Sequence, residues 1–447
     1  MNDWKVITLA DCASFQEGYV NPSKNEPSYF GGTIKWLRAT DLNNGFVYKT
    51  SQTLTEKGFL SAKKSAVLFE PDSLAISKSG TIGRIGILKD YMCGNRAVIN
   101  IKVNENICNP LFIFYTLLNS KEQIETLAEG SVQKNLYVSA LSKVKLLLLD
   151  INKQKEIGYI LNTLDQKIEL NTQINQTLEQ IAQALFKSWF VDFDPVRAKI
   201  QALSDGLSLE QAELAAMQAI SGKTPEELTA LSQTQPDRYA ELAETAKAFP
   251  CEMVEVDGVE VPKGWELSTI GDCYDVVMGQ SPKGETYNEN KQGMLFYQGR
   301  AEFGWRFPTP RLFTIDPKRI AEQNSILMSV RAPVGDINIA LEKCCIGRGL
   351  AALQHKSKSL SFGLYQIQSI KPELDLFNGE GTVFGSINQD NLKNIQIINP
   401  DEKFIQLFEK YLSSCDSKIM NNEIENNALK EIRDLLLPRL LSGEIQL

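Results

Sequence analysis

The chain has 447 residues, of which 43% are hydrophobic and 23% are charged, and its net charge is −8. This composition is typical of globular domains and leaves room for roughly two to four of them. Charged side chains interrupt residues 1–19, which argues against a secretion signal, and no stretch approaches the roughly 18 uncharged apolar residues of a membrane helix. We therefore expect a cytoplasmic protein without membrane partners.

Residues 1–150 are expected to form a domain of mixed α/β structure. Short β-rich runs at Ser73–Ile76, Arg84–Leu88 and Ala97–Val103 are separated by Gly and Asn, which favour turns. A helix is predicted at Pro110–Ala128, because apolar residues recur there at helical spacing.

Residues 151–194 are predicted to contain a long helix, from about Asn152 to Phe190. Asp194 and Pro195 then end it. Its apolar seam has alternating spacings of four and three residues, which is the heptad rule of coiled coils. The seam consists of Ile157, Leu161, Leu164, Ile168, Asn171, Asn175, Leu178, Ala182, Leu185 and Trp189.

Residues 195–262 are expected to form an acidic helical joint with a formal charge of −7. Two short helices are predicted, around Ser208–Ile220 and Pro225–Ala248, followed by a turn-rich stretch that leads to Trp265. Most of the negative charge of the chain lies in this joint. Residues 1–150 and 263–400 carry +3 and +1, which permits DNA binding there without demonstrating it.

The rest of the chain repeats the beginning. Trp4–Cys12 matches Trp265–Cys273 in part, and residues 73–97 align on 325–349 without gaps. The residues shared by the second pair of segments include Ser73/Ser325, Ser77/Ser329, Gly83/Gly335, Ile85/Ile337, Cys93/Cys345 and Arg96/Arg348. Residues 263–400 are therefore predicted to form a second domain like the first, and residues 401–447 a second long helix, from about Asp401 to Leu436.

The second helix repeats the heptad seam 251 residues later, from Phe408 to Leu440. Each seam contains two asparagines near its middle, Asn171 and Asn175 in the first and Asn422 and Asn426 in the second. A polar residue in such a seam costs stability and fixes register. We predict antiparallel pairing, with Asn171 beside Asn426 and Asn175 beside Asn422. The alternative is a solvated break in a weakly amphipathic helix.

Catalytic and metal-binding motifs are scarce. The eight cysteines form no CxxC pair and His355 is the only histidine, so we expect no metal site, and Ser/His or Cys/His catalysis is disfavoured. No P-loop motif occurs. The glycines of Gly80–Gly86 are three apart, which favours a turn between strands over a nucleotide site. We expect no catalytic residue in this chain.

Basic and polar side chains near glycine are the candidates for DNA contact. Arginine recognises guanine with two hydrogen bonds, Asn or Gln recognises adenine, and Lys and Ser more often hold phosphate. For each residue the alternative is a solvated surface position or a structural ion pair. The arginines shared by both copies, Arg96 and Arg348, are interpreted as structural. The candidates are Arg38, Lys78, Ser79, Thr81, Arg84, Gln133, Lys134 and Asn135 in the first copy, and Arg300, Arg306, Arg331, Ser386 and Asn388 in the second.

Several stretches together resemble a known family. Residues 261–272, 34–42 and 77–84 resemble parts of the target-recognition domains of type I restriction–modification enzymes, and residues 130–136 resemble the end of such a domain. Residues 184–193 and 437–445 resemble the conserved regions of the same family. The order and duplication of these stretches identify the chain as similar to the specificity subunits of these enzymes.

This resemblance implies an α+β architecture with two target-recognition domains held apart by two long antiparallel helices in a pseudo-twofold arrangement. It implies a non-catalytic subunit that recognises a bipartite, asymmetric site in double-stranded DNA. Two methyltransferase subunits would use S-adenosylmethionine to methylate a flipped adenine, and motor-nuclease subunits would use ATP and Mg. This chain would itself hold no cofactor.

Two alternatives remain open at the level of sequence. One is an enzyme that acts alone on nucleotides or DNA, and the other is a coiled-coil interaction protein that does not bind DNA. The recognised bases stay undetermined, because base choice depends on loop geometry.

Overall fold

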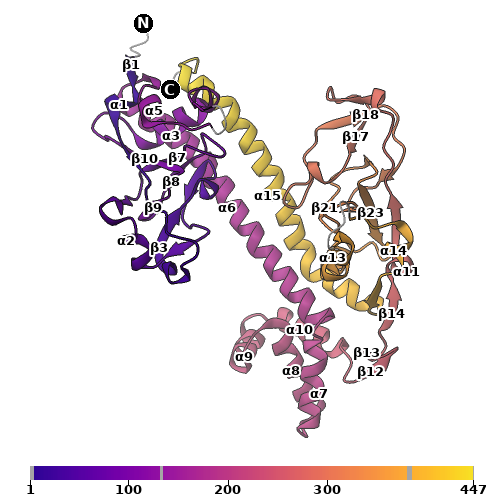
Figure 1. Cartoon of the computed structure of the whole chain (residues 1–447). Helices are drawn as coiled ribbons and strands as arrows, with labels where there is room; N and C mark the ends of the chain where they lie inside the picture. The colour runs from indigo at the N-terminus through magenta and orange to yellow at the C-terminus, as the bar shows by residue number, and fades with distance from the viewer. Residues whose placement is uncertain (1–4, 131–133, 380–384, 446–447) are drawn as a thin grey trace. The chain divides into compact units, whose positions relative to one another are not determined.

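A computed structural model describes residues 5–130, 134–379 and 385–445 of the chain (Figure 1). The chain forms two compact units. Unit 1 comprises residues 1–173 and 422–447, and unit 2 comprises residues 174–421. Two long helices, α6 (Ile151–Phe190) and α15 (Glu402–Ser442), each contribute one part to each unit. The units are therefore described separately.

The described residues of unit 1 form three small sheets, with strand orders β1-β11, β2-β10-β7-β8-β4 and β5-β3-β9-β6. Its strands are β1 (Lys5–Thr8), β2 (Ala13–Glu17), β3 (Phe30–Leu37), β4 (Gly45–Val47), β5 (Thr53–Leu54), β6 (Leu68–Phe69), β7 (Leu74–Ser77), β8 (Ile85–Leu88), β9 (Met92–Gly94), β10 (Val98–Val103) and β11 (Lys145–Leu148). Its helices before α6 are α1 (Leu9–Cys12), η1 (Pro27–Tyr29), η2 (Ala39–Asp41), α2 (Glu56–Leu60), η3 (Lys63–Ser65), α3 (Pro110–Asn119), α4 (Lys121–Thr126) and α5 (Val138–Leu141).

The central strand β7 of unit 1 is buried on both faces. Leu74 and Ile76 belong to a core shared with α3, and Ala75, on the opposite face, belongs to a second core. Its neighbours β8 and β10 both pair antiparallel with it. The three predicted runs thus correspond to β7, β8 and β10, which confirms the mixed α/β prediction for this segment.

The parts of α6 and α15 that belong to unit 1 pack against each other in antiparallel register. Asn171 donates its side-chain amide to Asn426 Oδ1 at 3.0 Å, as predicted. A second contact lies about one and a half to two helical turns from the asparagine pair. There, Arg433 Nη1 donates to Asp165 Oδ1 at 2.7 Å. Leu161 and Leu440 lie in the same core as the sheet. Asn175 and Asn422 belong to different units, so their pairing stays a prediction.

In unit 2, apart from residues 380–384, the structure describes four sheets, with strand orders β12-β13, β14-β24, β15-β23-β20-β21 and β16-β18-β17-β22-β19. Its strands are β12 (Met253–Val256), β13 (Val259–Pro262), β14 (Glu266–Thr269), β15 (Tyr274–Met278), β16 (Tyr287–Asn288), β17 (Met294–Tyr297), β18 (Leu312–Thr314), β19 (Ile320–Ala321), β20 (Ile326–Ser329), β21 (Ile337–Ile339), β22 (Cys344–Ile346), β23 (Leu350–His355) and β24 (Gln396–Asn399). The short helices that accompany these strands are α11 (Ile270–Cys273), η4 (Gly284–Thr286), η5 (Arg300–Glu302), α12 (Leu360–Ser369), α13 (Lys371–Asp375), η6 (Leu376–Asn378) and α14 (Gln389–Lys393).

The order of elements in unit 2 reproduces that of unit 1. The strand order β15-β23-β20-β21 corresponds to β2-β10-β7-β8, and in both units a parallel pair, β17-β22 or β3-β9, belongs to the neighbouring sheet. The central strand β20 also faces two cores, with Ile326 in one and Leu327 in the other. The structure therefore confirms the duplication that the sequence predicts; Trp4, one of the matched residues, lies outside the described residues.

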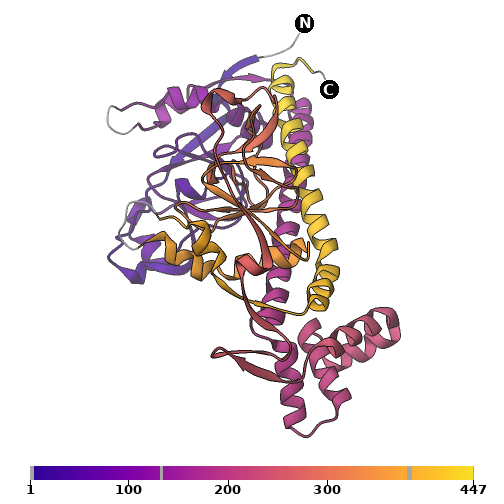
Figure 2. The ribbon, with the colours of Figure 1, turned by 90° about the vertical axis from the view of Figure 1, so that its right-hand side faces the viewer.

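The acidic joint is part of unit 2 and contains four helices, which gather near the end of α6 in Figure 2. They are α7 (Asp194–Ser204), α8 (Leu209–Ser221), α9 (Pro225–Thr234) and α10 (Pro236–Ala248). Their apolar residues, including Met217 and Phe249, belong to the same core as Trp265 and the central sheet. The joint is thus packed onto the second domain and does not form a separate core.

The helices differ from the predictions in four places, and prolines explain two of the differences. Pro195 and Pro236 stand near the starts of α7 and α10, where a missing amide costs nothing, so each begins a new helix. The predicted helix at 110–128 is divided at Ser120, which caps α3. α15 continues through Pro438 to Ser442, because Leu440 and Leu441 are buried in the core of unit 1.

In the described part of the chain, no helix is long and apolar enough to cross a membrane.

His355, at the end of β23, is buried in unit 2 beside aromatic rings. Its ring lies 4.9 Å from that of Tyr274 and 5.2 Å from that of Phe362, and its Nδ1 is 2.7 Å from Ser357 Oγ. Burial, with a smaller contribution from the charge of Lys356, lowers its pKa to about 4. The imidazole is therefore neutral at neutral pH and packs as part of the core.

His355 should make the protein sensitive to acid. Because its pKa is lower in the folded state than the ordinary value of about 6.5, protons bind preferentially to the unfolded chain. The contribution of His355 to stability is complete above about pH 6.5 and is lost as the pH falls toward 4. The loss of unfolding free energy amounts to about 2–3 kcal/mol by pH 4.5. The free energy of unfolding, measured from pH 7.5 to 4.5, should fall less steeply in His355→Phe. Parallel curves for the two proteins would refute this.

Candidate nucleic-acid interface

A glycine loop, residues 78–84, connects β7 to β8 in unit 1. Ser77 Oγ holds the loop at its middle and at its end: it donates to the Thr81 carbonyl at 2.5 Å and accepts the Arg84 amide at 2.9 Å. Gly83 has a φ of +82°, a conformation that glycine adopts without strain. Ser79, Thr81 and Arg84 therefore belong to a loop of defined shape, in which Thr81 is exposed and Ser79 and Arg84 are half-buried.

A turn at residues 95–97 lies beside this loop. The Lys78 amide donates to the Ala97 carbonyl at 2.8 Å, and the Asn95 amide donates to the Leu37 carbonyl at 2.9 Å. Gly18 permits this close packing, since a Cβ there would lie 2.1 Å from the Asn95 carbonyl oxygen. The turn thus places the Arg38 backbone near the glycine loop.

The segment that begins at Lys134 completes this surface. The Leu136 amide donates to the Lys78 carbonyl at 2.8 Å, and Asn135 and Glu129 exchange two backbone hydrogen bonds. Lys134 is exposed, and Gln133 lies outside the described residues. The structure therefore brings together residues 78–84, 95–97 and 134–136, which we call the loop surface of unit 1.

Two basic candidates in unit 1 have partners within the protein. Lys78 Nζ lies 2.7 Å from Glu17 Oε1, and this contact lowers the pKa of Glu17. Arg38 bonds to Ser51 Oγ and lies over the ring of Trp36, at 5.7 Å from its centroid. Their contact with DNA stays a prediction, because each side chain remains partly exposed.

Unit 2 has the same arrangement with different side chains. Ser329 Oγ donates to the Pro333 carbonyl at 2.7 Å and accepts the Asp336 amide at 2.9 Å. Arg331 and Ser386 are exposed and form a β-bridge. We call residues 330–336, 347–349 and 385–388 the loop surface of unit 2. Asn388 is exposed but caps α14, accepting the Asn391 amide at 2.8 Å.

The charge at the end of the loop differs between the copies. Arg84 in unit 1 and Asp336 in unit 2 occupy matching positions, since the amide of each donates to the serine that fixes the loop. Asp336 forms an ion pair with Arg300. Because the two loops share their backbone contacts and differ in side chains, they present different chemistry on a similar frame.

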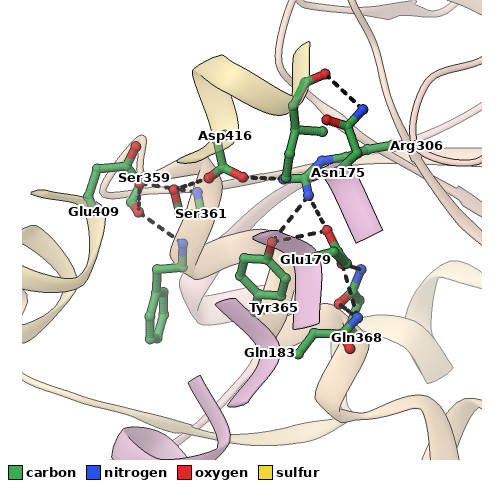
Figure 3. A network of polar contacts seen from close by, with 12 residues as sticks. Asn175, Glu179, Gln183, Arg306, Ser359, Ser361, Tyr365, Gln368, Glu409 and Asp416 are labelled. Atoms are coloured by element: carbon green, nitrogen blue, oxygen red, sulfur yellow. Dashed lines mark hydrogen bonds and ion pairs between the residues drawn. The ribbon is translucent and has the colours of Figure 1, made fainter. Parts of the chain in front are cut away.

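The prediction that Arg306 contacts DNA is wrong. Its guanidinium is 5% exposed and forms ion pairs with Glu179 of α6 and Asp416 of α15 (Figure 3). Arg306 Nη1 also donates to Tyr365 Oη at 3.1 Å. Arg306 therefore attaches the second recognition domain to the helices within unit 2, and its guanidinium is already paired with two carboxylates.

Neighbouring polar residues extend this attachment. Ser359 bonds to Glu409 and Ser361 to Asp416, so that the start of α12 is held by α15 (Figure 3). Burial alone would lower the pKa of Arg306, but Tyr365, Asp416 and Glu179 outweigh it, and the pKa rises. The guanidinium stays charged, and the carboxylates beside it are the partners that a buried cation requires.

The surroundings of Arg96 and Arg348 differ from those expected of structural residues. Both are exposed, and in the described part of the chain neither guanidinium has a hydrogen-bond or ion-pair partner. In each case the backbone amide donates a hydrogen bond, from Arg96 to Asn21 Oδ1 at 3.4 Å and from Arg348 to Ser281 Oγ at 3.3 Å. The signal in the sequence was the identity of the two residues at matching places in both copies.

Comparison with known proteins places this arrangement in a family. The family model described as type I restriction modification DNA specificity domain matches residues 1–180 and 262–431. The chain is 40% identical, over the full length of both proteins, to the type I restriction enzyme HindI specificity subunit of Haemophilus influenzae. The chain belongs to the family of type I restriction–modification specificity subunits.

Other members agree with this assignment. This chain is 23% identical to the type I restriction enzyme MjaIX specificity subunit of Methanocaldococcus jannaschii, over 99% of this chain and 94% of that protein. The crystal structure of the S subunit from M. genitalium shares its fold, with a TM-score of 0.57 at 15% identity, covering 98% of this chain and 96% of the other. The two copies found in this specificity subunit correspond to its two matches to the family model.

A metal site would need several His, Cys, Asp or Glu side chains close together. Among the residues that the structure describes, no group of three or more His, Cys, Asp or Glu side chains could hold one. The family model that matches the chain is described as a DNA specificity domain.

Replacing Arg306 should destabilise unit 2. Arg306→Leu leaves Glu179 and Asp416 buried without their cation, which is expected to cost about 3–5 kcal/mol of unfolding free energy. Urea denaturation followed by tryptophan fluorescence measures this, since Trp189 and Trp265 lie in the same core. The control is Arg300→Ala, whose more exposed pair with Asp336 should contribute at most about 1 kcal/mol. Equal losses in the two variants would contradict the structural role of Arg306.

Proposed function

We propose that this specificity subunit recognises a bipartite, asymmetric site in double-stranded DNA, with each recognition domain contacting one half. The observation that carries the proposal is the pair of loop surfaces, which share a backbone frame and differ in side chains. Lys78, Ser79 and Thr81 in unit 1 stand where Val330, Arg331 and Pro333 stand in unit 2. Two such loops suit two different base sequences.

The side chains of each loop surface suit contact with DNA. In unit 2, Arg331 presents a guanidinium that can form two hydrogen bonds to guanine, and Asn388 presents an amide of the type that recognises adenine. In unit 1, Lys134 and Arg84 supply positive charge, while Ser79 and Thr81 supply hydroxyl groups that can bind phosphate or base edges. The near-neutral charge of each domain suits a subunit that shares DNA binding with partners.

We further propose that the long helices dock two methyltransferase subunits. In unit 1, Tyr159 and Leu170 of α6 and Ile432 and Leu435 of α15 are exposed, although long helices normally bury such residues. Motor-nuclease subunits would join the complex through these partners. S-adenosylmethionine, ATP and Mg would belong to the partners, and this chain would supply no catalytic group.

The alternatives of a stand-alone enzyme and of an interaction protein that does not bind DNA are less favoured. Family membership argues against both. The only histidine, His355, is buried, and its pKa of about 4 makes it a poor base near neutral pH.

Exchange of one recognition domain tests the proposal. Residues 1–150 would be replaced by the corresponding domain of another specificity subunit, and the chimera would be assembled with its partner subunits. Selection of bound sequences from randomised DNA should show one half-site changed and the other retained, because each domain has its own core. The reciprocal exchange of residues 263–400 is the control and should change the other half-site. If either exchange changed both halves, the domains would not act independently.

A further inference from the structure

The shared residues of the two loop regions mostly have an internal explanation. Ser77 and Ser329 hold the middle and the end of their loops by the same two hydrogen bonds. Gly83 and Gly335 have φ values of +82° and +87°. Ser73/Ser325, Cys93/Cys345 and Ile87/Ile339 are all at most 6% exposed. In the remaining pair, Ile85 is buried and Ile337 packs against the core of unit 2. Folding alone accounts for the identity of these residues in both copies.

Arg96 and Arg348 are the exception. Their guanidinium groups are exposed and have no partner in the described part of the chain, so internal packing does not explain why the same residue occurs twice. Only the backbone at this point is constrained, and different side chains hold it, Asn21 in one copy and Ser281 in the other. The shared side chain therefore points to something outside the chain that both copies meet.

The position of each arginine indicates what that shared element is. Ala97 follows Arg96 and accepts the Lys78 amide at 2.8 Å, while Gly349 follows Arg348 and accepts the Val330 amide at 2.9 Å. Each arginine thus lies beside the loop whose side chains differ between copies. The part of DNA that is the same in both half-sites is the sugar–phosphate backbone, and arginine binds phosphate well.

We propose that Arg96 and Arg348 bind backbone phosphates of the DNA, one in each half-site, and so position the adjacent loops over the bases. This inference rests on the proposed function of the chain. Within each loop surface, the arginine common to both copies contacts the phosphate, and the loop residues that differ between the copies contact the bases. The opposite charges of Arg84 and Asp336, at matching places in the loops, agree with this division.

Salt dependence of binding distinguishes phosphate contacts from base contacts. Arg96→Gln, Arg348→Gln and the double variant would be assembled with the partner subunits, and DNA affinity would be measured by fluorescence anisotropy across a salt series. Each lost phosphate contact should reduce the slope of log K against log salt by about 0.9, and the double variant should lose about twice that. Affinity should fall by a similar factor for cognate and unrelated DNA.

Matched controls lie at the far ends of the same strands. Lys102→Gln in β10 and Lys358→Gln just after β23 remove one exposed positive charge each, about 20 Å along the strand from the turns. They should leave the slope unchanged. Arg96→Lys and Arg348→Lys should largely restore it, because a phosphate contact needs the charge, whereas a guanine contact needs the planar guanidinium.

Three results would overturn the inference. If Arg96→Gln altered the preference at one base position and Lys failed to restore it, the arginine would contact a base. If the variants failed to assemble with the methyltransferase subunits, the arginines would contact protein. If the arginine variants bound DNA like the Lys102→Gln and Lys358→Gln controls, the arginines would contact neither DNA nor a partner protein. In each case the unaltered complex still selects a split site, so a complex that selects none would refute the proposed function instead.

Discussion

Antiparallel packing of α6 with α15 is the contact on which each unit depends. Neither helix can cover its own apolar seam, so in each unit a part of one helix packs against a part of the other. A tyrosine at the same place in α3 and α12 then attaches each recognition domain. Tyr115 donates to Asp165 of α6 at 2.6 Å, and Tyr365 donates to Glu179 of α6 at 3.2 Å. An arginine completes each site, Arg433 from α15 in unit 1 and Arg306 from the domain itself in unit 2.

The architecture could be predicted from the sequence because its signals are periodic or repeated. A seam with spacings of three and four predicts α6 and α15, and the equal position of asparagines in both seams predicts the observed contact of Asn171 with Asn426. The gap-free match of residues 73–97 to 325–349 predicts two copies of one domain. The interpretation of Pro195 was less successful, since a proline that ends one helix also suits the start of the next.

Individual site residues were harder to predict, because a side chain's role depends on partners that are distant in sequence. Arg306 looks like a surface arginine near glycine, yet Glu179 and Asp416 lie 127 and 110 residues away and bury it. Arg96 and Arg348 were interpreted as structural because they are duplicated, whereas the structure leaves their side chains exposed. Duplication marks a shared constraint, but only the structure distinguishes a constraint of folding from one imposed by a ligand.

The central claim is that two copies of one domain give the chain two different DNA specificities. Sequencing of the host's methylated genome, with and without the gene for this chain, tests it most directly. The account predicts a single motif made of two short, different, specified stretches separated by an unspecified gap, with methylated adenine in each. That motif should disappear when the gene is deleted while the methyltransferase gene remains. A continuous motif, a motif with two identical halves, or methylation that survives the deletion would contradict the account.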